Sequence, residues 1–362
     1  MSDAGPVDWA LAGRVAGRVA ATLQRRPAGP NEFEQSSFQL DDVPVVDIAN
    51  RIEAATGLRS ALGDPTITLI GRDQWVRANI ESFRHMLAPM LERMAEKMAN
   101  KPGILTSATA KITGTEVGAL LGWMSTRVLG QYDLLIGRDP NDDAVYLVEP
   151  NLASLEQRFG FDPTEFRTWV LTHELTHRAQ FTGVPWMRDY FESLVTQMLS
   201  MADSDPKVLI DALRSAARDR DETLSLIKQH GLAGVIAGPE QRAVLDRIGG
   251  LMSLLEGHGD VVMSRAAAEL VPNAVRFERI LQQRRSKGNP LAKLIQRLTG
   301  IEAKLNQYAA GERFIAQIEA HGGPRLIDRC WRDPEFLPTI KEIREPQRWL
   351  DRVGDTPIAD AG

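Results

Sequence analysis

The chain has 362 residues, of which 43% are hydrophobic and 25% are charged, and its formal net charge is −5. This composition is typical of a globular protein with a substantial core, and the negative net charge gives no sign of the basic surface that nucleic-acid binding requires. Cys330 is the single cysteine, which excludes a disulfide framework and a cysteine-based metal site. The chain shows neither a signal-peptide pattern nor a run of eighteen apolar residues. We therefore expect a cytoplasmic protein with no membrane span and no nucleic-acid partner.

Apolar residues recur every three or four positions along much of the N-terminal half, which predicts helices over residues 7–24, 71–100 and 119–133. The second of these helices could instead be a pair that breaks near Pro89. Strand signals are few. The clearest strand covers residues 144–150, residues 133–137 could be its hairpin partner, and residues 66–71 are a further extended candidate.

The C-terminal half is also predicted to be helical. Residues 184–236 have helical spacing, and the glycine-rich residues 231–242 are either a flexible lid or a connector. The last hundred residues predict three or more helices, with breaks at 287–290 and 321–324. Together these features predict a mainly α protein with a small β-hairpin.

The sequence Asp162-Pro163-Thr164-Glu165 predicts a helix start, because the aspartate can cap the first free amides and proline suits the first helical position. The apolar residues of the following helix and two histidines should lie on one stripe, which places both histidines on the inward face. The stripe consists of Phe166, Trp169, Val170, His173 and His177. Gly183 and Pro185 should end the helix.

His173, Glu174 and His177 form an H-E-x-x-H pattern. Two imidazoles one helical turn apart can bind the same ion, which makes His173 and His177 candidate zinc ligands. Glu174 is rotated by about 100° from His173, so its carboxylate could act on a water bound to the zinc. The alternative interpretation is a pair of core histidines that are hydrogen-bonded to the backbone, with Glu174 exposed.

A third ligand must come from elsewhere, and residues 251–263 offer candidates, because this apolar stretch predicts a buried helix that nevertheless carries Glu256, His258 and Asp260. His258 is rotated by roughly 200° from Glu256, so the two do not readily bind one ion. Either Glu256 binds zinc and Asp260 orients a ligand histidine, or His258 binds zinc and the carboxylates support it. The E-x-x-x-D spacing matches the gluzincin pattern and favours Glu256.

Other features could support the site. Gly257 and Gly259 would let their helix approach the histidine helix closely, or only pack against another helix. Tyr308 and Tyr190 are candidate donors to an oxyanion, although a half-buried structural role is the alternative for each. The strand at residues 145–148 could pair with an extended peptide, or be a plain hairpin strand.

Six segments together resemble an actinobacterial family of zincin-like metallopeptidases, whose members are labelled as hydrolases or as proteins associated with biosynthesis of a deazaflavin coenzyme: LGQYDLLIG, YLVEPNL, THELTHRAQFTGVPWMRDY, SLLEGHGDVVM, KLNQYAAGERF and CWRDPEFLPTIKEIREPQRWLDRV. The resemblance implies a mainly α, zincin-like helical fold with His173 and His177 as ligands and Glu174 as the base. The resemblance covers the chain from about residue 40 to about residue 354, and no clean linker divides this part. We therefore expect one zincin-like domain over residues 41–354, preceded by an N-terminal helix and variable segment (1–40) and followed by a disordered tail of low complexity (355–362). The long interval between His177 and Glu256 departs from thermolysin-like enzymes, which predicts a family-specific insertion.

We therefore predict a Zn²⁺-dependent hydrolase, a metallopeptidase that uses a zinc-bound water with Glu174 as general base and acts on a peptide or amide substrate. Two alternatives stay open at this point. One is a non-catalytic scaffold protein that a metal stabilises, and the other is an amidohydrolase that acts on a small molecule. The sequence does not predict the oligomeric state.

Overall fold

The structure is a computed structural model, and it describes residues 6–23, 43–98, 103–133, 143–201, 238–286 and 301–354. The chain divides into two compact units. Unit 1 comprises residues 1–50, 62–178 and 269–272, and unit 2 comprises residues 51–61, 179–268 and 273–362. The predicted domain bounds stay a prediction.

Unit 1 contains a small sheet and most of the N-terminal helices: α1 (Trp9–Leu23), β1 (Thr66–Ile70), α3 (Arg72–Met98), α4 (Gly103–Ser125), β2 (Gly130–Tyr132), β3 (Ala144–Val148), α5 (Glu149–Phe159) and the greater part of α6 (Pro163–Thr182). Helix α2 (Val45–Thr56) has residues in both units. The predicted helix at residues 71–100 forms as one helix, α3, with Pro89 inside it.

The sheet has three strands in the order β1-β3-β2, with β3 parallel to β1 and antiparallel to β2. The predicted hairpin is therefore part of a mixed sheet, in which residues 130–132 pair antiparallel with β3 and the Asp133 amide donates to the Ala144 carbonyl oxygen. Apart from Asp133, the predicted partner strand, residues 133–137, lies outside the described part. The helix predicted to reach residue 133 ends at Ser125. Because β3 is the central strand, the prediction that residues 145–148 pair with a peptide is wrong.

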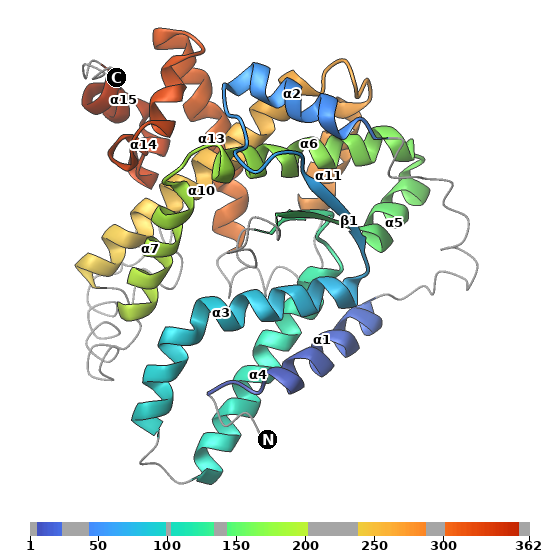
Figure 1. The fold of residues 1–362 in the computed structure, drawn as a ribbon, viewed down its shortest axis with the longest axis vertical. Coiled ribbons are helices and arrows are strands. Elements are labelled where there is room, and N and C mark those ends of the chain that lie inside the picture. The colour runs from blue at the N-terminus through green and yellow to red at the C-terminus, as the bar shows by residue number, and fades with distance from the viewer. Residues whose placement is uncertain are drawn as a thin grey trace. The chain divides into compact units, whose positions relative to one another are not determined.

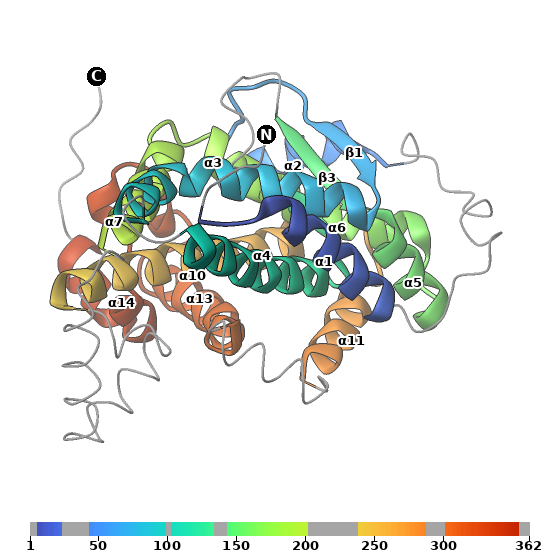
Figure 2. The same cartoon turned by 90° about the horizontal axis from the view of Figure 1, so that it is seen from below.

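Helices α1 and α4 lie side by side in unit 1 (Figures 1 and 2). A Cβ atom on Gly118 would lie 2.4 Å from the carbonyl oxygen of Ala12, and one on Gly122 would lie 2.5 Å from that of Ala16. Only glycine allows this approach, since no Cβ atom tolerates such distances. The two helices pack next to a hydrophobic core cluster of unit 1. Its buried members are Ala16, Ile70, Trp75, Val76, Leu121 and Val148.

Unit 2 contains the C-terminal end of α6 and the remaining elements: α7 (Met187–Met201), α10 (Pro239–Ala266), α11 (Ala274–Ser286), α13 (Ile301–Gly322), η3 (Leu326–Trp331), η4 (Pro334–Phe336), α14 (Ile340–Arg344), α15 (Pro346–Trp349) and η5 (Leu350–Gly354). The predicted helical character of this half is confirmed where the structure describes it. Residues 202–237 lie outside the described part. They include most of the segment predicted as a lid or connector, residues 231–242.

Within unit 2, α10 packs closely on α13 (Figure 1). A Cβ atom on Gly257 would lie 2.5 Å from the carbonyl carbon of Gly311, and one on Gly311 would lie 2.0 Å from the oxygen of Ser253. Gly257 therefore serves the contact with α13, not an approach to the histidine helix. In the described part of the chain, no helix combines the length and hydropathy that crossing a membrane requires.

Candidate metal centre

Helix α6 begins and ends as the sequence predicts. The amide of Glu165 donates to Asp162 Oδ1 at 2.8 Å, so the aspartate caps the helix, and Pro163 occupies the first helical position. The helix ends at Thr182, directly before Gly183. The cap and the terminal glycine thus fix the limits of the segment that carries H-E-x-x-H.

Helix α6 is buried on nearly every side. Between residues 166 and 181, His173 and His177 are the two partly exposed residues, and all others are buried. The predicted inward stripe is confirmed for Phe166, Trp169 and Val170, which are buried, whereas His173 and His177 of the same stripe are partly exposed. Polar residues are tolerated elsewhere because they find partners; for example, the Thr172 and Thr176 hydroxyls donate to the carbonyl oxygens four residues earlier at 2.9 and 2.7 Å.

Two buried ion pairs anchor α6 within unit 1. Arg167 donates to both carboxylate oxygens of Glu156 at 2.7 and 3.0 Å. Arg178 donates through Nε to Asp143 at 2.6 Å and through Nη2 to the carbonyl oxygen of Gly63 at 2.8 Å. Sequence reasoning missed both arginines. Their spacing of about three helical turns puts both arginines on the same side of the helix, and this spacing could have indicated that the helix carries two buried ion pairs there.

The two histidine rings meet edge to face, with their centroids 4.5 Å apart and an interplanar angle of 83°. The Nε2 atoms of His173 and His177 are 3.1 Å apart. Two nitrogen ligands of one tetrahedral zinc ion, each about 2.0–2.1 Å from it, would lie roughly 3.3 Å apart. The pair is therefore spaced and exposed as two ligands of one ion would be.

Glu174 lies against strand β2. It is 9% exposed, and its Oε2 atom accepts a hydrogen bond of 3.0 Å from the backbone amide of Tyr132. A Cβ atom on Gly130 would lie 2.7 Å from Glu174 Cγ and 2.9 Å from Oε1. Sequence reasoning did not single out Gly130 or Tyr132, because nothing local indicates that this strand meets α6.

One group of three side chains in the described residues could hold a metal ion: His173, His177 and Glu256, all partly buried. One ligand atom of each lies within 4.8 Å of the others. Two imidazole nitrogens and one carboxylate oxygen are a donor set that zinc accepts, and three protein ligands leave a position for water. The residues present thus fit the metal that the sequence pattern predicts.

His258 has a different environment from Glu256. It is 4% exposed and packs on the Trp331 ring with centroids 4.9 Å apart. Its Nδ1 atom is 2.9 Å from Gln180 Nε2, which also donates to the carbonyl oxygen of Leu255 at 3.0 Å. The structure therefore gives His258 core contacts and leaves it out of the group of three.

Asp260, the predicted second-shell residue, interacts with Glu312 of α13. Burial, the negative charge of Asp260 and a hydrogen bond with Asp260 raise the pKa of Glu312 to about 7. Glu278 raises it further and Arg313 lowers it. Asp260, one helical turn beyond Glu256 on α10, thus contacts a carboxyl group of α13 that titrates near neutral pH.

The two tyrosine candidates differ in what can be said of them. Tyr308 falls on a part of α13 whose side chains lie outside the described residues. Tyr190, on α7, packs edge to face on Trp186 with centroids 6.0 Å apart. The pKa of Tyr190 is raised because the side chain is partly buried, and the positive charge of Arg247 offsets part of this rise. These contacts give Tyr190 a packing role.

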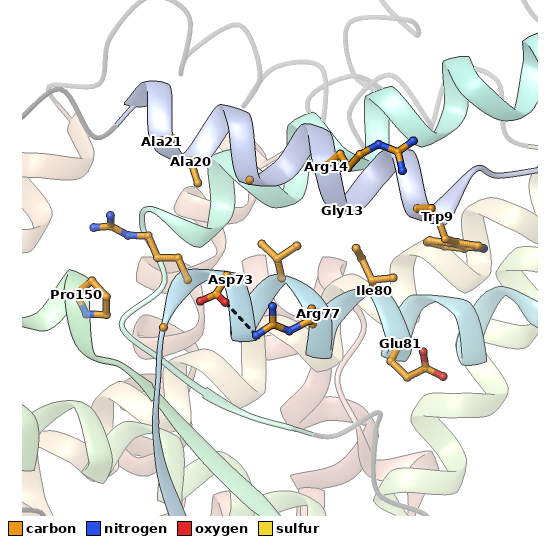
Figure 3. A pocket seen from close by; sticks show the side chains of 15 residues that line it. Trp9, Gly13, Arg14, Ala20, Ala21, Asp73, Arg77, Ile80, Glu81 and Pro150 are labelled. Atoms are coloured by element: carbon orange, nitrogen blue, oxygen red, sulfur yellow. Dashed lines mark hydrogen bonds and ion pairs between the residues drawn. The ribbon is translucent and has the colours of Figure 1, made fainter. Parts of the chain in front are cut away.

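A cavity of about 1030 Å³ in unit 1 is separate from these residues. Figure 3 shows it between α1 and α3, where Trp9 and Ile80 lie near one end and Arg77 forms an ion pair with Asp73. None of the site residues predicted from the sequence lines it. Cavity size therefore does not identify the reaction centre, and the ligand chemistry on α6 is the better guide.

Comparisons with known proteins agree with this interpretation. A family model described as zincin-like metallopeptidase matches residues 7–350. A solved structure from Chloroflexus aurantiacus, titled as a "putative hydrolase with a novel fold", is similar with 31% sequence identity and a TM-score of 0.69. That match covers 97% of this chain and 100% of the other. No curated protein matches the chain.

Proposed function

The chain belongs to the zincin-like metallopeptidase family, and from this premise we propose that it is a zinc-dependent peptidase with His173, His177 and Glu256 as ligands and Glu174 as general base. The observation that carries the proposal is the exposure pattern of α6. Between residues 166 and 181 the two histidines are partly exposed while every other residue is buried, and Glu174 is fixed beside them. A purely structural metal site would need neither feature.

Glu256 is the third ligand that the contacts favour. Helix α6 continues without a break past His177, and Gln180, three residues later, donates to the carbonyl oxygen of Leu255. Residues three apart share a helix face, so this bond brings the backbone next to Glu256 to the face that carries the histidines. Gln180 also holds His258 Nδ1, which gives His258 a positioning role next to that backbone.

A zinc ion at this site would acidify a water molecule toward neutral pH and polarise the carbonyl group of the substrate. Glu174 accepts the proton of the attacking water, while the water oxygen bonds to the carbonyl carbon. Glu174 then delivers the same proton to the leaving amine nitrogen as the carbon–nitrogen bond breaks.

The test compares the wild-type chain with Glu174→Gln, using a fluorogenic peptide library and metal analysis of the same samples. We expect Glu174→Gln to retain zinc and to lose roughly 10²- to 10⁴-fold in kcat, the usual contribution of a general base. Zinc-bound wild-type protein without hydrolysis of any peptide or small amide would favour the scaffold alternative. Hydrolysis of small amides alone would favour the amidohydrolase alternative. The actinobacterial origin that the resemblance implies stays a prediction.

A further inference from the structure

We propose that strand β2 positions the catalytic base: the Tyr132 amide fixes Oε2 of Glu174, Gly130 provides the space for the carboxylate, and Oε1 is the atom that receives the proton. This inference rests on the proposed function, because it assigns atoms to the base of that reaction. It makes Gly130 and the Tyr132 backbone positioning groups that act through Glu174.

The register of β2 explains why the Tyr132 amide is available. The amide of Asp133 donates to the Ala144 carbonyl oxygen, and the amide of Val148 donates to that of Leu129. In an antiparallel pair, hydrogen-bonded and non-hydrogen-bonded positions alternate. Tyr132 pairs with Val145 at a non-hydrogen-bonded position, so its amide points away from β3. Edge-strand amides need another partner, and Glu174 Oε2 is that partner at 3.0 Å.

A backbone donor is well suited to hold this carboxylate. The hydrogen bond is charge-assisted, and such bonds are about twice as strong as neutral ones. The strand is held in turn by the sheet, so the donor cannot swing away as a side chain could. With Oε2 engaged by Tyr132, the proton of the attacking water passes to Oε1, and from Oε1 it passes to the leaving nitrogen.

Gly130 allows this arrangement because it has no side chain. An added Cβ would lie 2.9 Å from Oε1, 2.7 Å from Cγ of Glu174 and 3.0 Å from Cγ1 of Val170. Val170 and Glu174 belong to one helix, which the buried ion pairs of Arg167 and Arg178 anchor. The helix therefore cannot withdraw easily, and an alanine at position 130 must displace the carboxylate.

The first test needs neither metal nor substrate. The chain contains 4 tyrosines, so full-length protein labelled with ¹⁵N-tyrosine gives few amide signals, and Tyr132→Phe identifies the one from residue 132. We expect the Tyr132 amide proton to move upfield and to exchange faster with solvent in Glu174→Ala, because the charge-assisted bond is lost. Glu165→Gln, which changes a carboxylate at the start of the same helix, is the matched control and should leave the signal unchanged.

The second test measures catalysis on the peptide library. A displacement of about 1 Å can cost roughly a hundredfold in rate, so Gly130→Ala should lower kcat by about this factor while zinc content and KM stay unchanged. The same substitution at Gly17, where an added Cβ meets nothing within 4 Å, is the control. In the Glu174→Gln background, Gly130→Ala should cause no further loss, because the group through which it acts is absent.

The proposal is overturned if the Tyr132 amide signal is the same in wild type and Glu174→Ala, or if Gly130→Ala lowers kcat equally in both backgrounds. If Gly130→Ala does not fold, the comparison of the Glu174 variants by NMR still decides. A shifted amide signal in a protein that hydrolyses no peptide would support the positioning of Glu174 and refute the proposed function, so the two failures are distinguishable.

Discussion

Loss of Asp143 should destabilise the protein strongly, because it would leave the Arg178 guanidinium buried without its counter-charge. The side chains of Arg178 and Asp143 are 3% and 6% exposed. Removing one partner of such a buried pair costs about 3–5 kcal/mol, whereas an exposed pair contributes about 0–1 kcal/mol. Asp143→Ala should therefore lower the free energy of unfolding by about 3–5 kcal/mol.

The chain offers a matched control for this prediction. Arg348 Nε lies 2.6 Å from Glu345 Oε2, the same distance as Arg178 Nε from Asp143 Oδ2, but the side chains are 61% and 60% exposed. The two ion pairs thus have the same nitrogen–oxygen distance and differ in the burial of their side chains. Arg348→Ala should change the free energy of unfolding by no more than about 1 kcal/mol.

Urea unfolding followed by tryptophan fluorescence measures both variants, and a third variant separates charge from packing. Replacing both partners, Asp143→Ala with Arg178→Leu, should recover much of the stability, since no buried charge is left alone. Equal effects of Asp143→Ala and Arg348→Ala would refute the reasoning that burial sets the energy. A double variant no more stable than Asp143→Ala would show that the lost contacts, not the uncompensated charge, cause the loss.

Two further predictions concern unit 2. Gln180→Ala should lower the free energy of unfolding by about 1–3 kcal/mol, because it removes the buried partner of His258 Nδ1. A urea titration measures this loss, and a loss below a few tenths of a kcal/mol would contradict the prediction. The pKa of the Glu312 carboxyl group is raised from 4.5 to about 7, so the folded state binds the carboxyl proton more tightly than the unfolded state does. The resulting contribution to the free energy of unfolding is complete below pH 4.5 and is lost as the pH rises to about 7. Glu312→Gln should remove this part of the pH dependence, and melting curves from pH 4 to 8 that are parallel to those of the wild type would contradict it.

The histidine helix was the most predictable part of the molecule. Its cap at Asp162, its stop at Gly183 and the spacing of His173 and His177 are local features, and local features are what a single sequence encodes most directly. Its orientation was not predictable in the same way. A helix buried on nearly every side has no apolar stripe to read, so the partly exposed side cannot be inferred from hydrophobic spacing.

The sheet and its contact with Glu174 could not be predicted from spacing. Strand β1 pairs in parallel with β3 across a long interval of sequence, and β2 has three residues, too few for an alternating pattern to stand out. Pairings between distant segments depend on tertiary packing. For that reason Gly130 and Tyr132 were missed, whereas the charged residues of the buried helix α10 were found, because an isolated carboxylate in an apolar stretch is conspicuous.

The most direct test of the account is the zinc content of purified, dialysed protein, measured by plasma mass spectrometry for the wild type, Glu256→Gln and His258→Gln, with circular dichroism as the check of folding. The account predicts about one zinc per chain in the wild type and in His258→Gln, and loss of zinc from folded Glu256→Gln. Zinc that stays in Glu256→Gln and is lost from folded His258→Gln would contradict the ligand set, and a wild-type protein that binds no zinc would contradict the metal centre itself.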